Sequence, residues 1–173
     1  MGSGIIEQFA ERYECIPISR YYLKPDKFPE FKILVSKHRP EVIINAAAVV
    51  GLLNVESNYN LALHVNSELP GVLGKLSRIM DFKLIQISTN SVFEQTSGYA
   101  YYEDSHPAPI SKYAQTKFAG EQKANEHGGN VVILRVPNLY SKNLYFETNL
   151  LKKLVQNIKT NNVVISKNEI ISI

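Results

Sequence analysis

Short β-branched runs alternate with longer helical stretches along this chain, and this alternation restricts the fold more than any other feature. Val42–Ile44 is one such run, and similar apolar runs occupy 83–88 and 131–134. Strands that alternate with helices of roughly ten to fifteen residues favour right-handed crossovers and a mostly parallel sheet. The sequence therefore predicts an α/β fold with a doubly wound, mostly parallel sheet.

The predicted elements follow from periodicity and from proline and glycine signals. Pro17 favours an edge position for the first strand, and Pro70 predicts a kink or two helices in the third helical stretch. The run Val42–Ile44 is typical of a strand buried on both faces. Helices are predicted at 5–13, 28–38, 59–80, 111–126 and 147–159, strands at 14–19, 42–44, 83–88, 131–134 and 163–166, and a loop at 91–110.

Composition excludes several classes of protein. The net charge is only +3 and the Lys and Arg residues are scattered, which argues against a nucleic-acid surface. The single cysteine, Cys15, excludes an internal disulfide and is expected to be a buried small residue. The four histidines lack metal-ligand spacing and are interpreted as surface or loop residues. No stretch approaches the roughly 18 apolar residues of a membrane span, and no signal peptide is recognisable, so a soluble cytoplasmic protein is expected.

Three polar or small-residue stretches follow predicted strands. They are N-A-A-A (Asn45–Ala48), S-T-N (Ser88–Asn90) and R-V-P-N (Arg135–Asn138). Ligands of open parallel sheets bind beyond the carboxyl ends of the strands, so all three stretches are expected at one crevice. Each also has a plainer interpretation, because alanines pack well anywhere and a hydroxyl at a strand end often forms a turn.

Tyr113 and Lys117 lie four residues apart near the start of a predicted helix, which Ser111 could cap. Residues at that spacing share a helix face. A neighbouring ammonium favours the phenolate and would lower the tyrosine pKa from about 10, which suits a general acid for a carbonyl oxygen. The alternative is a chance pairing on a solvated face.

Taken together, these motifs resemble the extended short-chain dehydrogenase/reductase family and, more narrowly, the dTDP-4-dehydrorhamnose reductase group. The segments that carry the resemblance are R-P-E-V-I-I-N-A-A-A (39–48), I-S-T-N-S-V-F-E (87–94), Y-Y-E-D-S-H-P-A-P-I-S-K-Y-A-Q-T-K-F-A-G-E (101–121) and V-I-L-R-V-P-N-L-Y (132–140). The resemblance implies a single NAD(P)-binding, Rossmann-like domain over 1–173. Relative to the family, this domain lacks the first strand and most of the C-terminal substrate lobe.

The resemblance also implies roles for individual residues. Thr89 would hydrogen-bond the substrate carbonyl, Tyr113 would donate the proton, and Lys117 would hold the nicotinamide ribose. Asn90, Ser91 and Asn138 would face the substrate. Arg20 would suit a 2′-phosphate, which favours NADP over NAD, although a solvated surface arginine is an equal alternative. The full set implied for the cofactor is Gly2, Gly4, Ile5, Arg20, Ala46, Ala47, Ala48, Tyr113 and Lys117.

Several positions depart from the family pattern. The family begins with a strand and a loop G-x-x-G-x-x-G, whereas this chain begins M-G-S-G-I-I-E, with Glu7 near the place of the last glycine. Gly2 and Gly4 are interpreted as remains of that loop, with Ile5 opening the helix; a cloning remnant or a shortened start is the alternative. The family commonly has Asp-Tyr where this chain has Asn90-Ser91, and often Trp near Asn138.

Three functions are compatible with these features. The leading hypothesis is NADP-dependent reduction of a 4-keto-6-deoxy sugar nucleotide. The second is a non-catalytic nucleotide-binding or regulatory subunit, similar to the β subunit of methionine adenosyltransferase, whose L-R-I-P-type stretch resembles Leu134–Pro137. Epimerisation or dehydration on the same scaffold ranks below both, because Asn90 and Ser91 supply no additional acid or base. The expected partners are a nucleotide sugar and either a second copy of this chain or another subunit, but neither nucleic acid nor a membrane.

Overall fold

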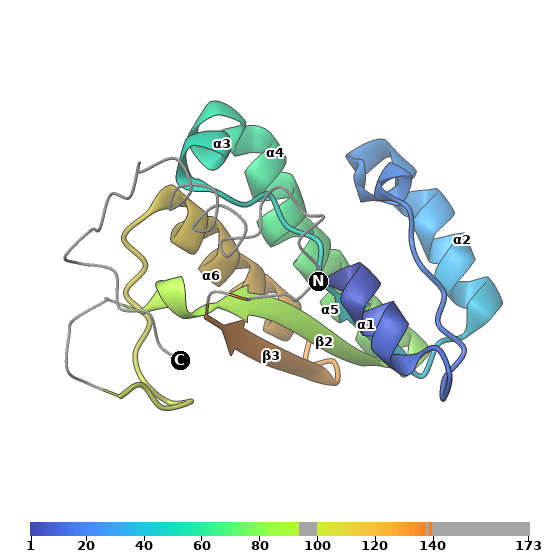
Figure 1. The fold of residues 1–173 in the computed structure, drawn as a ribbon. Coiled ribbons are helices and arrows are strands. Elements are labelled where there is room, and N and C mark those ends of the chain that lie inside the picture. The colour runs from blue at the N-terminus through green and yellow to red at the C-terminus, as the bar shows by residue number, and fades with distance from the viewer. Residues whose placement is uncertain (94–99, 138, 140–173) are drawn as a thin grey trace, which may run out of the picture. The chain divides into compact units, whose positions relative to one another are not determined.

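The computed structural model describes residues 1–93, 100–137 and 139. Residues Met1–Pro137 form one compact unit (Figure 1). In chain order its elements are α1 (Gly2–Phe9), the 3₁₀ turns η1 (Arg20–Leu23) and η2 (Pro25–Lys27), α2 (Phe28–His38), β1 (Val42–Asn45), α3 (Leu52–Ser57), α4 (Tyr59–Leu63), the π-helical turn η3 (His64–Glu68), α5 (Leu69–Met80), β2 (Lys83–Thr89), the 3₁₀ turn η4 (Asn90–Val92), α6 (Lys112–Glu126) and β3 (Val131–Val136).

The three described strands form a parallel sheet in the order β1-β2-β3. Ile44 lies opposite Ile85, and Ile85 lies opposite Val132. Each pair of neighbouring strands is joined by helices, α3 to α5 between β1 and β2 and α6 between β2 and β3. The predicted α/β architecture with parallel strands is confirmed.

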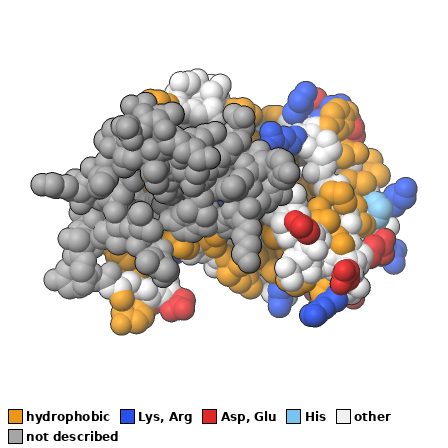
Figure 2. Space-filling view, in the orientation of Figure 1, with side chains coloured by type: hydrophobic (Ala, Val, Ile, Leu, Met, Phe, Trp, Pro, Cys, Tyr) orange, Lys and Arg blue, Asp and Glu red, His pale blue; other side chains and the backbone are white. Residues whose placement is uncertain are grey.

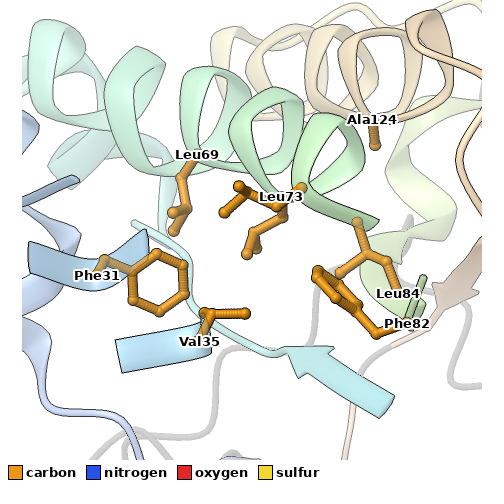
Figure 3. Packing of buried hydrophobic residues seen from close by; sticks show 8 residues of the cluster. Phe31, Val35, Leu69, Leu73, Phe82, Leu84 and Ala124 are labelled. Carbon is orange, nitrogen blue, oxygen red and sulfur yellow. The ribbon is translucent and has the colours of Figure 1, made fainter. Parts of the chain in front are cut away.

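The hydrophobic core lies between one face of this sheet and the helices α2, α5 and α6 (Figure 3). Its buried members are Phe31, Val35, Leu69, Leu73, Leu76, Phe82, Leu84 and Ala124, with Ile43, Val131 and Ile133 packed against them. Since side chains alternate along a strand, Val42 and Ile44 point to the opposite face, where they are 46% and 39% exposed. The prediction that this strand is buried on both faces is therefore wrong for the described part of the chain.

Helices α5 and α6 cross at unusually short range. A Cβ added to Gly74 would lie 2.1 Å from the backbone oxygen of Ala124, and one added to Gly120 would lie 2.0 Å from the backbone oxygen of Asn66. Only glycine fits at such contacts. The two glycines thus allow α6 to approach α5 and η3 closely, and this approach fixes α6 against the sheet.

Some predicted elements agree closely with the structure, and others differ. The predictions for 28–38, 83–88 and 111–126 match α2, β2 and α6 to within one residue. The stretch 59–80 is helical, but a π turn at His64–Glu68 precedes Pro70, which lies in the first turn of α5. Helix α3 was not predicted. The predicted helix 147–159 and strand 163–166 lie outside the described residues.

The N-terminal predictions need correction. The first helix begins at Gly2 rather than Ile5 and ends at Phe9, and residues 14–19 are not a strand. A strand needs a neighbour for its backbone hydrogen bonds, and no described strand pairs with this segment. Ile16 and Ile18 are accordingly 40% and 43% exposed.

Two side chains also differ from their predicted surroundings. Cys15 is half-buried rather than buried. His64 is not a free surface residue, because its Nε2 lies 2.7 Å from the Leu23 oxygen and its ring stacks on Phe28.

Charged side chains of both signs are interspersed over the described part of the face shown in Figure 2. Within the described ranges, none of the helices has the length and apolar character needed to cross a bilayer.

Candidate active site

The carboxyl ends of the strands bring the described parts of all three predicted stretches to one edge of the sheet. Because the strands are parallel, the residues that follow Asn45 and Thr89 leave the sheet at the same edge, where Val136 lies opposite Thr89. Asn45 itself pairs with Gln86, and its Nδ2 donates to Gln86 Oε1 at 2.7 Å. The predicted common edge is thus present.

Two buried asparagines hold the alanine stretch after β1. Asn45 Oδ1 accepts a hydrogen bond from the Ala47 amide at 3.2 Å. Asn66 Oδ1 accepts from the Val49 amide at 2.9 Å, and Asn66 Nδ2 donates to the Val49 oxygen at 3.0 Å and to Thr116 Oγ1 at 3.1 Å. The half-buried side chains of Ala46, Ala47 and Ala48 therefore lie on a loop that is tied to α6 one residue before Lys117.

Asn66 was missed by sequence reasoning. It stands inside a helical stretch, where an asparagine is ordinarily exposed, yet it is only 1% exposed here. Its sequence position carries no signal of this role, because the role depends on two partners that lie 17 and 50 residues away.

The start of α6 forms as predicted. Ser111 has an extended backbone and its Oγ accepts a hydrogen bond from the Ala114 amide at 3.1 Å, which is an N-cap. This cap places Tyr113 in the first turn of α6 and Lys117 one turn later on the same face.

Lys117 is buried beneath the strand end. It is 3% exposed, and its Nζ donates to the backbone oxygen of Ile87 at 2.6 Å. Burial lowers the pKa of Lys117 from 10.5 to about 8, while the negative charge of Glu121 acts in the opposite direction. A lysine in this state carries a charge that neighbouring groups can control near neutral pH.

Tyr113 lies next to Thr89, as the shared-site hypothesis requires. The side chain of Thr89 lies near enough to the phenol to favour its ionised form. Burial raises the pKa of Tyr113, and Thr89 lowers it by a smaller amount. The predicted lowering of this pKa by Lys117 is wrong for the described structure, because desolvation dominates and the ammonium bonds to Ile87 instead.

The residues predicted to face the substrate form a tight turn after β2. Thr89 Oγ1 accepts a hydrogen bond from the Ser91 amide at 3.2 Å and lies 3.2 Å from Ser91 Oγ. Ser91 is half-buried and Asn90 is exposed. Asn138 lies outside the described residues.

The remaining predicted cofactor residues have no contact with Thr89, Tyr113 or Lys117 among the described interactions. Gly2, Gly4 and Ile5 belong to helix α1, so Gly2 and Gly4 do not form a loop. Arg20 is exposed at the start of η1, with no strand before it. Within the described part of the chain, none of the four makes a side-chain hydrogen bond to Thr89, Tyr113 or Lys117. No three His, Cys, Asp or Glu side chains of that part gather closely enough to hold a metal ion.

The chain is similar to several known proteins. The model of the family described as "RmlD substrate binding domain" matches residues 1–167. The chain is 39% identical over 92 residues to a dTDP-4-dehydrorhamnose reductase of Streptomyces griseus, which covers 53% of this chain and 30% of that protein. It is 36% identical over 109 residues to the methionine adenosyltransferase 2 subunit beta of Xenopus laevis, which covers 63% of this chain and 32% of that protein.

A solved structure is similar over a longer stretch. The dTDP-4-dehydrorhamnose reductase of Bacillus anthracis in complex with NADP has a TM-score of 0.81 at 27% identity, over 92% of this chain and 56% of that one. The chain thus spans about a third of the length of these two curated relatives and just over half of this solved one.

Proposed function

Because the chain belongs to the RmlD substrate-binding domain family, we propose that it carries the catalytic residues of a reductase that acts on a nucleotide-linked 4-keto-6-deoxy sugar. One observation supports this most directly: the side chain of Thr89, far away in sequence, lies near enough to Tyr113 at the strand edge to act on the pKa of its phenol. Lys117 lies one turn after Tyr113 and bonds to the oxygen of Ile87, two residues before Thr89.

The residues around the strand edge fit a nicotinamide cofactor. Ala46, Ala47 and Ala48 are small and half-buried, which leaves room for a flat ring against the backbone after β1. Lys117 would hold the nicotinamide ribose. At the other end, Gly2 and Gly4 lie in the first turn of α1, where N–H groups without a helical partner favour a phosphate, and Ile5 follows with its amide bonded to the Met1 oxygen. Arg20 would favour NADP, with NAD as the alternative.

In this proposal the cofactor supplies a hydride to the carbonyl carbon, and the chain manages the oxygen. Thr89 Oγ1 donates a hydrogen bond to the carbonyl oxygen and orients it toward Tyr113. Tyr113 Oη transfers its proton to that oxygen, so that the ketone becomes an alcohol and the phenolate recovers a proton from solvent. The raised pKa of Tyr113 keeps this proton in place until the substrate arrives. Asn90, Ser91 and Asn138 would contact the sugar.

The test is oxidation of NADPH by the full chain with a dTDP-linked 4-keto-6-deoxyhexose. Tyr113→Phe should lower kcat by about 10²- to 10⁴-fold, the usual contribution of a positioned general acid. Tyr102→Phe is a matched control, because Tyr102 is 67% exposed and should retain turnover. Turnover of Tyr113→Phe equal to that of the native protein would show that the acid is assigned wrongly.

A second candidate is a non-catalytic nucleotide-binding subunit. It is favoured by the similarity to the methionine adenosyltransferase 2 subunit beta, which is nearly as strong as that to the Streptomyces griseus reductase. A thermal shift with NADPH separates the candidates when it is measured beside turnover. Stabilisation without turnover for any 4-keto sugar nucleotide would favour the binding subunit.

A further inference from the structure

A buried carboxylate that pairs with an arginine lies one helical turn from Lys117. Glu121 lies one turn after Lys117 on α6 and is 4% exposed. Arg135 Nε donates to Glu121 Oε1 at 3.2 Å and Oε2 at 3.1 Å, and Arg135 Nη2 donates to Oε2 at 2.7 Å. The charge of the same carboxylate raises the pKa of Lys117. One buried anion therefore serves two cations.

Arg135 is itself fixed from the other side. Its guanidinium lies over the ring of Phe93, 4.9 Å from the centroid, and Phe93 stacks on Tyr101 at 4.5 Å with an angle of 5° between the rings. Phe93 follows the Thr89–Val92 turn directly. The carboxylate is thus held by groups from β3 and from the segment after β2, and a charge that is held rigidly in a dry site acts strongly on its neighbours.

Glu121 is the one charged group of the described residues that acts on the pKa of Lys117. Most other titratable or charged groups on the elements packed against α6 are exposed: Glu56, Tyr59, Glu68, Lys75, Arg78 and Lys83. The remaining one, His64, is bonded to the Leu23 oxygen. Tyr113, on α6 itself, lies next to Thr89. Control of the charge on Lys117 therefore falls to Glu121 and to the arginine that shares it.

We propose that Glu121 is a positioning residue that keeps Lys117 in its ammonium form at the Ile87 oxygen, and that Arg135 limits this effect by sharing the carboxylate. The importance of this charge for catalysis rests on the proposed function, but its effect on Lys117 does not. The alternative is an ion pair that only fastens α6 to β3 and leaves Lys117 unaffected.

The two interpretations differ because Lys117 titrates close to neutral pH. With a pKa of about 8, the buried ammonium is near the point at which it loses its proton. Removal of the carboxylate would leave the buried ammonium of Lys117 without the negative charge that offsets its desolvation. Lys117 would then lose its proton at a lower pH than in the native protein.

The charge of Lys117 can be followed directly in the full chain labelled with ¹³C,¹⁵N-lysine, by NMR titration of its side-chain signals. The Lys117 signal is assigned by its loss in Lys117→Met. In the native protein we expect a midpoint of about 8. In Glu121→Gln, which keeps the shape and removes the charge, the midpoint should fall below the native one, and Glu121→Asp should restore part of the difference. Glu68→Gln is the matched control, because it removes the exposed ion pair with Lys123 and should leave Lys117 unchanged.

A folded Glu121→Gln protein, as judged by circular dichroism, with an unchanged or raised Lys117 midpoint would overturn the proposal. If that variant does not fold, Arg135→Gln decides, because it frees the carboxylate for Lys117 and should raise the midpoint. An unchanged or lowered midpoint in Arg135→Gln would refute the sharing of charge. The titration needs no turnover, so a native protein that never oxidises NADPH would refute only the proposed function.

Discussion

Lys117→Met should change the pH dependence of folding stability more clearly than it changes stability at any one pH. The native pKa of Lys117 is about 8 and its ordinary value is 10.5. Between these values the unfolded chain keeps the proton that the native protein has lost, so native stability rises with pH by up to about 1.4 kcal/mol per pH unit. Below pH 8 both states are protonated, and above pH 10.5 both are neutral. The contribution of Lys117 is therefore unfavourable at neutral pH and vanishes in alkali.

The magnitude follows from the width of this window. A lowering from 10.5 to about 8 corresponds to roughly 3 kcal/mol, as an order of magnitude. Methionine does not titrate. The free energy of unfolding of Lys117→Met minus that of the native protein should therefore fall by roughly 3 kcal/mol between about pH 7 and pH 11. At pH 7 the variant gains from the removal of a buried charge and loses the hydrogen bond to the Ile87 oxygen, worth about 1.5–3 kcal/mol.

Urea unfolding followed by circular dichroism across this pH range measures the effect. The raised pKa of Tyr113 makes native stability fall as pH rises past 10, but both proteins share this loss and it cancels in the difference. Lys123→Met is the control, because Lys123 is 40% exposed in a surface ion pair and its difference from the native protein should stay flat. A Lys117→Met difference that stays constant over the whole window would refute the reasoning.

Three other substitutions test the packing and hydrogen bonds that position the site, each by urea unfolding at neutral pH. Gly74→Ala should cost more than about 3 kcal/mol, because the added Cβ would collide with the Ala124 oxygen. Gly4→Ala is the control: Gly4 has open space around it, so the substitution should be neutral or stabilising by up to about 1 kcal/mol. Equal effects of the two substitutions would contradict the close crossing of α5 and α6. Asn66→Ala should cost about 2–4 kcal/mol, because it leaves the Val49 amide and oxygen without their partner, and a loss below about 0.5 kcal/mol would count against the clamp. Ser111→Ala should cost about 1 kcal/mol, because it removes the cap on the Ala114 amide. Ser111→Asp should keep most of this stability, because aspartate is also a good N-cap.

Elements whose determinants are local could be predicted from the sequence. Helix α6 was recognised because Ser111 supplies a cap at one end and Gly128, at φ 63°, ends the run at the other. Strand β2 was recognised from the apolar residues Leu84, Ile85 and Ile87 within a short segment. Neither prediction required knowledge of what lies next to the element.

Elements that depend on distant partners could not be predicted in the same way. Residues 14–19 have the composition of a strand, yet a strand forms only where a neighbour accepts its hydrogen bonds. Asn66 has the composition of an exposed helical residue, yet its amide fastens Val49 to Thr116. In both cases the decisive information lies far away in the chain.

The site shows the same limit for charge. The spacing of Tyr113 and Lys117 correctly indicated a shared face, but spacing does not indicate depth. Burial favours the neutral form of both groups, so it raises the pKa of the phenol and lowers that of the amine at once. In a buried tyrosine–lysine pair, burial thus favours the neutral phenol and the neutral amine. The lysine stays protonated near neutral pH to the extent that an anion lies close to it. The carboxylate one turn further along α6 is therefore as much a condition of the proposed chemistry as the two residues whose spacing first indicated it.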